Sequence, residues 1–468
     1  MLFTSVAFLI FLPCVVLLYY LLPARHRWLL LLPASYLFYG WWKVEFLVLI
    51  LFSTLVDYLV SRSMYQARSM IKRRLLLGVS LLSNLGLLFL FKYVIMFTEK
   101  PDPMILNIYS VDHPIMGMIK YGIYYAIPVG ISFYTFQTLS YTIDVYFQRI
   151  EPEKHFGRFA LFVSFFPQLV AGPIERFSHL MPQLKADHRF NYENVRNAFR
   201  LMLYGFFIKM CVADNIAPLV DAVYTNPNTY TTLSNWIGTL GFGFQIYADF
   251  AGYSLIAQGA SLLLGIQLMD NFRTPYLSTN ITEFWSRWHI SLSTWFRDYL
   301  YIPLGGNRVA YGRWVLNILV VFAVSGLWHG ADWKFMVWGL IHGAMYLLQR
   351  MGKQTGWTRT MPLWLSGLLT FIGVQFAWIF FRIDGMEGVS DHLHHLLHAG
   401  TQSLQIPPYV WLIIGFFILS DWILYNTRVD RWIGSKPIWL RWITYAWMLW
   451  CIAAWSGVTN HPFIYFQF

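Results

Sequence analysis

The sequence contains little charge and few cysteines, and each shortage excludes a class of protein. Only 12% of its 468 residues are charged, against about 25% in soluble domains. A chain that is 57% hydrophobic and 19% aromatic cannot cover a water-facing surface with so few charges. The three cysteines, Cys14, Cys211 and Cys451, lie far apart in apolar stretches. Their spacing excludes a disulfide framework and a thiolate metal site.

The short motifs of soluble enzymes are also absent. The sequence contains no GxSxG, Walker loop, HExxH or CxxC, so it does not support a serine hydrolase, a P-loop ATPase or a zinc protease. The net charge of +11 would suit nucleic acid, but the Lys and Arg residues occur in short clusters between apolar runs. That pattern is typical of the cytoplasmic loops of membrane proteins. We therefore expect no nucleic-acid partner.

What the sequence has instead is a series of apolar runs close to the length that crosses a bilayer. They predict one domain over residues 1–468, an all-α polytopic membrane protein with roughly 11–13 transmembrane helices. The first run has no basic region and no small-residue cleavage site, so we expect a retained helix rather than a signal peptide. The runs lie near residues 2–23, 28–42, 45–61, 75–97, 120–147, 201–222, 235–266, 314–330, 333–349, 362–381, 409–426 and 442–458.

The basic residues also predict the orientation of the chain. Clusters of Lys and Arg follow alternate apolar runs and should be cytoplasmic. The loops 223–234 and 385–408 contain no Lys or Arg, so we expect them outside, with both termini facing outward.

Two segments break this alternation. Residues 157–200 include a short apolar stretch interrupted by Pro167, Gly172 and Pro173, followed by a basic amphipathic run. Residues 271–313 mix Trp, Tyr and Phe with Arg and are too polar to span. Broken helices at membrane depth are tolerated where they line an enclosed cavity. We expect re-entrant and interfacial helices here, in contact with lipid and leading inward from the cytoplasm.

His329 is the first candidate for chemistry, because ionisable groups inside a membrane are costly and usually functional. It lies in SGLWHGADW, between two glycines, with Trp328 and Asp332 close by. A neutral imidazole, which titrates near ~6.5, could take a proton from a hydroxyl group. A buried histidine bonded to a backbone carbonyl is the alternative. His342 is also near, but its spacing alone does not pair it with His329.

His289 is the second candidate, in the segment EFWSRWHISLSTWFRDYLYIPLGGN. Trp285 lies four residues before it, on the same face of a helix, and Trp288 precedes it directly. The alternative is an aromatic belt at the membrane interface.

Polar residues around this segment could bind an anionic group. Arg297 and Asp298 precede a Gly-Gly turn, and Asn307 follows it. Such a turn permits tight backbone geometry, although a lone Gly-Gly is usually just a turn.

The histidine-rich stretch 391–398 allows a metal interpretation. His394 and His398 lie four residues apart and could share a helix face. No glutamate supports them, and the stretch lies in a predicted outer loop. A solvated polar loop is favoured, and we expect no metal site.

Several long motifs, in order along nearly the whole chain, resemble the membrane-bound O-acyltransferase (MBOAT) family, in the AlgI-like branch of alginate O-acetyltransferase membrane subunits. They include the opening FLPCVVLLYYLLP and ASYLFYGWW, then PVGISFYTFQTLSYTIDVY, FFPQLVAGPIERF, FGFQIYADFAGYSLIAQGASLLLGI, the segments around His289 and His329, and the final PFIYFQF.

The resemblance implies helices around a central tunnel through the bacterial cytoplasmic (inner) membrane. His329 matches the family's catalytic histidine and His289 its second signature histidine. The activity implied is acetyl transfer from a cytoplasmic thioester, acetyl-CoA or an acyl-carrier protein, with no bound cofactor. The acceptor would be an extracytoplasmic polysaccharide, alginate-like or peptidoglycan, served by a secreted SGNH-type acetyltransferase partner.

In this interpretation His329 is the general base and His289 positions the donor or the tetrahedral intermediate. The residues expected to contact the donor or substrate are Trp285, Arg287, Trp288, Arg297, Asp298, Asn307, Trp328 and Asp332. Two other functions stay open: a transporter or flippase, and a scaffold for a secreted transferase. Transporters often have two repeated halves, and this sequence shows no internal repeat.

Overall fold

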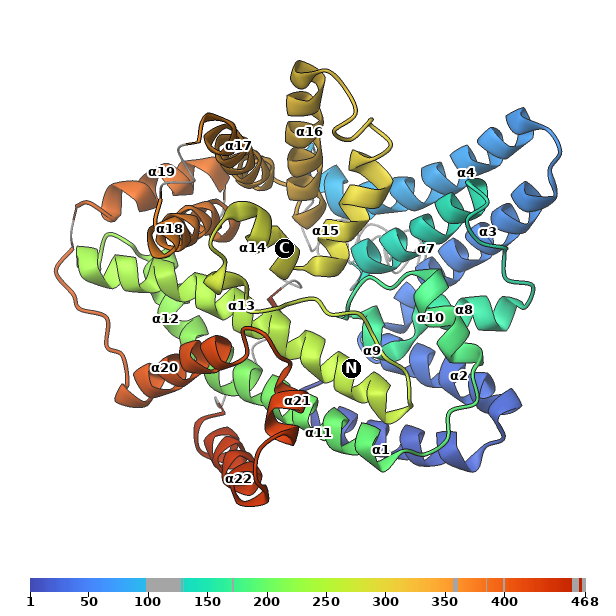
Figure 1. The fold of residues 1–468 in the computed structure, drawn as a ribbon, viewed down its shortest axis with the longest axis horizontal. Helices are drawn as coiled ribbons and strands as arrows, with labels where there is room; N and C mark the ends of the chain where they lie inside the picture. Colours follow the sequence, from blue (N-terminus) through green and yellow to red (C-terminus); the bar gives the residue numbers. More distant parts are fainter. Residues whose placement is uncertain are drawn as a thin grey trace, which may run out of the picture. The chain divides into compact units, whose positions relative to one another are not determined.

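A computed structural model describes residues 1–97, 128, 130–170, 172–356, 361–383, 385–398, 400–456 and 463–464. Over these residues the regular structure is helical, with no strand and one isolated bridge between Tyr230 and Gln402 (Figure 1). The predicted all-α fold is confirmed. The chain forms two compact units, residues 1–195 with 260–269, and residues 196–259 with 270–468. The expectation of one domain stays a prediction.

In the first unit, α3, α4 and α7 pack against one another, and α2 packs against α8. Its helices are α1 (Val6–Leu21), α2 (Arg27–Gly40), α3 (Leu47–Gln66), α4 (Met70–Leu88), α7 (Ile131–Tyr146), α8 (Phe156–Ser164), α9 (Phe166–Leu169) and α10 (Phe177–Lys185). Short 3-10 or π turns lie at Ala24–His26, Val44–Phe46, Phe89–Tyr93 and Val94–Met96.

A buried carboxylate joins two of these helices. Asp57 on α3 accepts hydrogen bonds from Ser80 Oγ (2.5 Å) and from Asn84 Nδ2 (3.0 and 2.9 Å) on α4. Thr138 of α7 extends the network to Asn84 at 3.3 Å. Polar side chains of this kind hold apolar helices together where no water is present to satisfy them.

We expect Asp57→Ala to lower the stability of the protein by about 1–3 kcal/mol, because the buried Ser80 hydroxyl would lose its acceptor and Asn84 Nδ2 would keep only its bond to Ser80 O. Unfolding in detergent micelles would measure the loss. Asp144→Ala is the control, because that carboxylate pairs with the half-exposed Arg149 at 3.0 Å, and surface pairs contribute little. An Asp57→Ala protein as stable as the Asp144→Ala control would contradict the structural role.

The second unit contains α12 (Asp214–Thr225), α13 (Thr232–Leu263), α14 (Ile281–Arg287), α15 (Ile290–Phe296), α16 (Tyr311–His329), α17 (Trp333–Thr355), α18 (Leu363–Arg382), α19 (Gly385–His395), α20 (Pro408–Ile423), α21 (Val429–Gly434) and α22 (Ile438–Trp455). Helix α11 (Tyr192–Phe206) leads into it and continues as a π turn at Phe207–Ala213. A 3-10 turn at Pro275–Leu277 precedes α14, and a π turn at Arg297–Tyr301 follows α15.

Glycines bring α16 and α17 into direct backbone contact. A Cβ atom at Gly326 would collide with the carbonyl oxygen of Phe335, and one at Gly339 with that of Phe322. Helix α18 packs beside α17 (Figure 1). The small residues therefore fix the spacing of the helices that carry His329 and Trp338.

The apolar runs predict the helix positions closely. For example, the runs 314–330 and 362–381 correspond to α16 and α18. Part of the run 120–147 lies outside the described residues. Among those described, four helical segments are long and apolar enough to cross a membrane: Val44–Gln66, Met70–Tyr93, Tyr311–His329 and Leu363–Arg382. The shorter helices Val6–Leu21 and Pro408–Ile423 are also apolar. The total of 11–13 spans stays a prediction.

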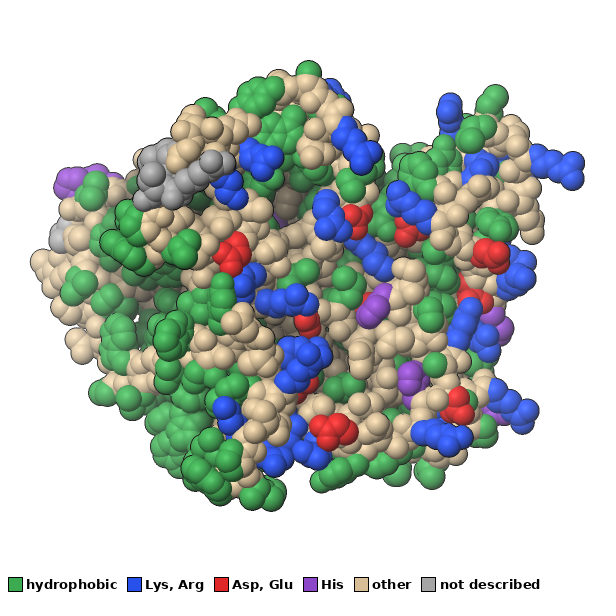
Figure 2. Space-filling model, in the orientation of Figure 1, with side chains coloured by type: hydrophobic (Ala, Val, Ile, Leu, Met, Phe, Trp, Pro, Cys, Tyr) green, Lys and Arg blue, Asp and Glu red, His purple; other side chains and the backbone are tan. Residues whose placement is uncertain are grey.

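The outer surface of the second unit separates apolar from basic side chains. Hydrophobic side chains cover the visible faces of α20 and α22, whereas Lys and Arg gather near α21 and the segment between α13 and α14 (Figure 2). Trp422 and Trp439 are 73% and 62% exposed. Large exposed apolar surfaces of this kind suit contact with lipid.

The two segments predicted to be broken are broken. Pro167 lies in α9, which is only four residues long, and the chain runs without regular structure before α10. Residues 271–313 form short helices and turns before α16 begins. Their placement relative to the membrane stays a prediction.

Candidate functional site

His289 lies at a sharp break between α14 and α15. The Asn280 side chain caps α14 by accepting a hydrogen bond from Glu283 N (3.0 Å), and Trp288 ends that helix. His289 then adopts a left-handed conformation, with φ 41° and ψ 55°, and begins α15. Non-glycine residues rarely adopt this geometry, and those that do cluster at functional sites. The side chain is 1% exposed.

Two hydrogen bonds to Asn271 hold this break in place. Ile290 N donates to Asn271 O (2.9 Å), and Ser291 Oγ donates to Asn271 Oδ1 (2.6 Å). The position of His289 is therefore tied to the segment that leads into α14.

His329 is the last residue of α16 and is 3% exposed. Three residues later, the Asp332 carboxylate caps α17 by accepting a hydrogen bond from Lys334 N (3.0 Å). The structure therefore places Asp332 in the turn that follows His329.

Aromatic rings connect the two histidines. The ring centroid of Trp328 lies 4.9 Å from that of His329 and 6.0 Å from that of His289. On its other sides His329 meets Trp338 at 5.0 Å and Phe381 at 5.2 Å. The structure thus brings together the two histidines that the sequence singled out, with Trp328 between them.

Trp285 and Trp288 belong to the wall around this cluster. The Trp285 ring lies 5.8 Å from that of Trp338. Trp288 is 1% exposed and packs on Trp378 of α18 at 5.0 Å. Sequence reasoning missed Trp338, Trp378 and Phe381. Trp338 was detectable as an aromatic residue one helical turn before His342, whereas α18 shows no such pattern.

Burial lowers the pKa of His289 to about 3, so the imidazole is neutral at physiological pH. An unfolded histidine titrates near ~6.5. Between these values the unfolded chain binds a proton that the folded chain does not, and stability therefore falls as the pH falls through this range.

We expect the wild-type protein to lose about 2 kcal/mol more stability than a His289→Gln variant between pH 7 and pH 5, because glutamine binds no proton. Urea unfolding in detergent at the two pH values would measure the difference. Equal losses in the two proteins would show that His289 is protonated in the folded state.

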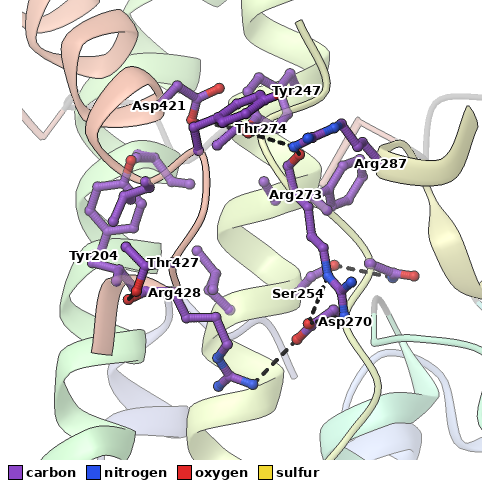
Figure 3. A pocket seen from close by; sticks show the side chains of 18 of the residues that line it. Tyr204, Tyr247, Ser254, Asp270, Arg273, Thr274, Arg287, Asp421, Thr427 and Arg428 are labelled. Atoms are coloured by element: carbon purple, nitrogen blue, oxygen red, sulfur yellow. Dashed lines mark hydrogen bonds and ion pairs between the residues drawn. The ribbon is translucent and has the colours of Figure 1, made fainter. Parts of the chain in front are cut away.

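A cavity of about 570 Å³ opens beside this cluster (Figure 3). Four arginines and three carboxylates line it, which leaves one net positive charge: Arg273, Arg287, Arg428, Arg431, Asp270, Glu283 and Asp421. Tyr204, Tyr247, Tyr425 and Phe272 are among its aromatic residues. We call it the arginine pocket. Of its charged residues, only Arg287 had been assigned to the site from the sequence.

Ion pairs hold three of the four arginines in place. Arg273 and Arg428 both reach Asp270, at 3.0 and 3.3 Å (Figure 3). Arg287 pairs with Glu283 at 3.0 Å and lies over the ring of Tyr425 at 4.3 Å. These partners keep the guanidinium groups extended at the cavity wall.

One aromatic layer separates the arginine pocket from His289. Phe272 lines the pocket, and its ring centroid lies 6.5 Å from that of His289. Because His289 and His329 are nearly fully buried, a substrate in the pocket reaches them only when a ring such as Phe272 moves.

A second cavity, of about 430 Å³, lies on the other side of the cluster. Trp285, Phe322 and Ser325 line it, together with Arg297. Arg297 is 60% exposed and pairs with Asp298 at 2.8 Å.

The predicted Gly-Gly turn is present, with φ values of 103° at Gly305 and 56° at Gly306. Asn307 follows it and is exposed.

The histidine-rich stretch is not a polar loop, and that prediction is wrong. Residues 385–395 form α19, and His392 is 2% exposed. His392 stacks on Tyr224 at 4.4 Å and shares a hydrogen bond with Thr239 Oγ1 (2.9 Å). The local alternation of polar and apolar residues gave no sign of this packing. In the described part of the chain, no group of three His, Cys, Asp or Glu residues could hold a metal.

Comparison with known proteins gives a consistent result. The family model described as MBOAT, membrane-bound O-acyltransferase family, matches residues 153–384. The chain is 36% identical over 501 residues to the probable alginate O-acetylase AlgI of Pseudomonas putida, covering 100% of both chains. It is 36% identical over 431 residues to the peptidoglycan O-acetyltransferase of Helicobacter pylori, covering 84% of this chain and 79% of the relative. The teichoic acid D-alanyltransferase of Bacillus subtilis is 27% identical over 318 residues, covering 64% of this chain and 74% of the relative.

Proposed function

The chain belongs to the membrane-bound O-acyltransferase family, and from that premise we propose that it moves an acetyl group from a cytoplasmic thioester to a hydroxyl group outside the membrane. As a member it is a multi-pass membrane O-acyltransferase. The donor, the acceptor and the direction of transfer are the proposal.

One observation carries it: two buried histidines share an aromatic cluster that lies one ring away from the arginine pocket. The arginines come from segments 271–313 and 428–441, both predicted to be cytoplasmic. Guanidinium groups suit the phosphate of acetyl-CoA or of a carrier-protein pantetheine arm. A thioester whose phosphate stays at Arg273 and Arg428 would extend its acyl end past Phe272 toward His289.

In the proposed reaction His329 accepts the proton of the acceptor hydroxyl as its oxygen attacks the thioester carbonyl. The C–O bond forms and the C–S bond breaks, and the departing thiolate takes the proton from His329. Neutral His289 would hold the carbonyl oxygen as charge develops on it. Trp285, Trp288 and Trp328 exclude water from the reacting atoms.

The acceptor we propose is an exported polysaccharide, because two of the relatives are named for alginate and peptidoglycan. A secreted SGNH-type acetyltransferase would complete the transfer to the sugar. The protein would lie in the bacterial inner membrane with both termini outward. A cysteine-accessibility scan should then label 385–408 from outside and 350–360 only from inside.

Proteoliposomes test the reaction directly. Vesicles would be loaded with [¹⁴C]acetyl-CoA, or with an acetylated carrier protein. The partner and the polysaccharide would then be added to the outer solution. We expect label on the external polysaccharide. Intact donor or glycan crossing the membrane without transfer would favour a transporter, and transfer that persists in His329→Ala would favour a scaffold.

A further inference from the structure

A third histidine lies next to the proposed catalytic pair. His342 is on α17, one helical turn after Trp338, and is 0% exposed. Its ring centroid lies 4.8 Å from that of Trp338, 5.0 Å from that of Trp285 and 6.1 Å from that of Phe284. No step of the proposed reaction uses it.

The nitrogens of His342 are unusual for a buried histidine. Neither Nδ1 nor Nε2 has a hydrogen-bond partner among the residues that the structure describes. A buried polar group left in this way costs about 1–3 kcal/mol, so it calls for an explanation. The ring meets Trp338 and Trp285 at interplanar angles of 69° and 78°. An edge-to-face arrangement lets a ring N–H point at an indole face, a weak but directional contact.

Trp338 connects His342 to His329. The Trp338 indole is 1% exposed and meets the His329 ring edge to face, at 5.0 Å and 85°. On another side it stacks on Trp378 at 5.7 Å and 26°. One indole thus contacts both imidazoles, with α18 behind it.

Backbone packing limits the movement of the part of α17 that carries Trp338. At Gly326 and Gly339 the backbones of α16 and α17 are already in contact, so α17 cannot move closer to α16. The direction of the Trp338 ring is set by its own side-chain torsions. Among the rings that surround Trp338 and restrict those torsions, His342 is the nearest, at 4.8 Å; Trp285, Phe381 and Trp378 lie at 5.8, 5.3 and 5.7 Å.

We propose that His342 is a positioning residue, which holds the Trp338 indole and through it sets the orientation of the His329 imidazole. This inference rests on the proposed function, because it assigns His342 a part in the same transfer. His342 itself touches neither substrate nor reacting atoms.

The test compares variants in which the side chain at position 342 still fills the space of the imidazole. His342→Phe preserves the ring and removes both nitrogens, and His342→Gln restores an N–H. In the proteoliposome assay we expect His342→Phe to lower kcat about tenfold with the KM for acetyl-CoA within twofold, and His342→Gln to recover part of the loss. Misplacing a catalytic group by a small distance is known to cost up to about 10²-fold.

His392→Phe is the matched control. His392 is another buried histidine, 2% exposed and stacked on Tyr224, and it belongs to no part of the proposed site. We expect its kcat to equal that of wild type. The double variant His342→Phe with Trp338→Phe should be no slower than the slower single variant, because both changes act through the same ring.

Three results would overturn the proposal: a wild-type kcat in His342→Phe, a loss confined to KM, or effects of the two substitutions that multiply. If His342→Phe does not fold, the same criteria apply to His342→Leu, which also removes both nitrogens. Transfer that survives His329→Ala would instead overturn the proposed function. An inactive His329→Ala beside a fully active His342→Phe would overturn this inference alone.

Discussion

Acetyl transfer by the His329→Ala protein is expected to fall by about 10²- to 10⁴-fold, the range that a positioned general base contributes. The substitution removes the group proposed to take the hydroxyl proton, and His342, which also contacts Trp338, is not proposed to reach the reacting atoms. The measurement is the initial rate of labelled acetyl transfer in proteoliposomes at saturating thioester.

His398→Ala provides the matched comparison, because His398 is an exposed histidine at the end of the α19 region. It should leave the rate unchanged. His329→Gln, which fills more of the same space, should be as slow as His329→Ala. If His329→Gln transfers acetyl at the wild-type rate, proton transfer by this residue is excluded.

Removing two guanidinium groups from the arginine pocket gives the second large effect. We expect Arg273→Gln with Arg428→Gln to raise the KM for the thioester about 10- to 100-fold, since a hydrogen bond to a charged group contributes about 1.5–3 kcal/mol. The kcat should stay near wild type because neither side chain is proposed to touch the reacting atoms. The KM would be measured with acetyl-CoA at two salt concentrations, and its salt dependence should weaken in the variant.

Arg149→Gln is the control for charge alone. Arg149 lies in the first unit, is 49% exposed and pairs only with Asp144 at 3.0 Å. The Arg149→Gln substitution should not change the KM for the thioester. A KM that rises equally in Arg149→Gln would indicate a general charge effect, and an unchanged KM in the double variant would exclude the pocket as the donor site.

The sequence predicts the fold better than it predicts the site. Apolar runs locate the helices because burial in lipid and burial in protein require the same residues, as α16 and α18 show. Pro167 and Gly172 predict the broken segment because their backbone effects are local.

The site depends on contacts between distant helices, which leave little local trace. His289 and His329 stood out because polar residues are rare in this chain, and the structure joins them through Trp328. Trp378 and Phe381 did not stand out, since most of their neighbours in α18 are also apolar. The same limitation explains why Asp270 was not identified from the sequence. Its role depends on two arginines that are 3 and 158 residues away along the chain. It also explains why the burial of His392 in α19 was not predicted, because in the sequence this residue is part of a polar stretch.

The glycine contacts between α16 and α17 determine where a passage to His329 can open. Separating this hairpin would break backbone packing along two helices, whereas rotating a side chain of α14, α18 or the segment around Phe272 would not. An inhibitor designed to wedge the hairpin apart would therefore work against the stiffest element near the reaction centre. A flat compound that displaces a single aromatic ring would meet far less resistance.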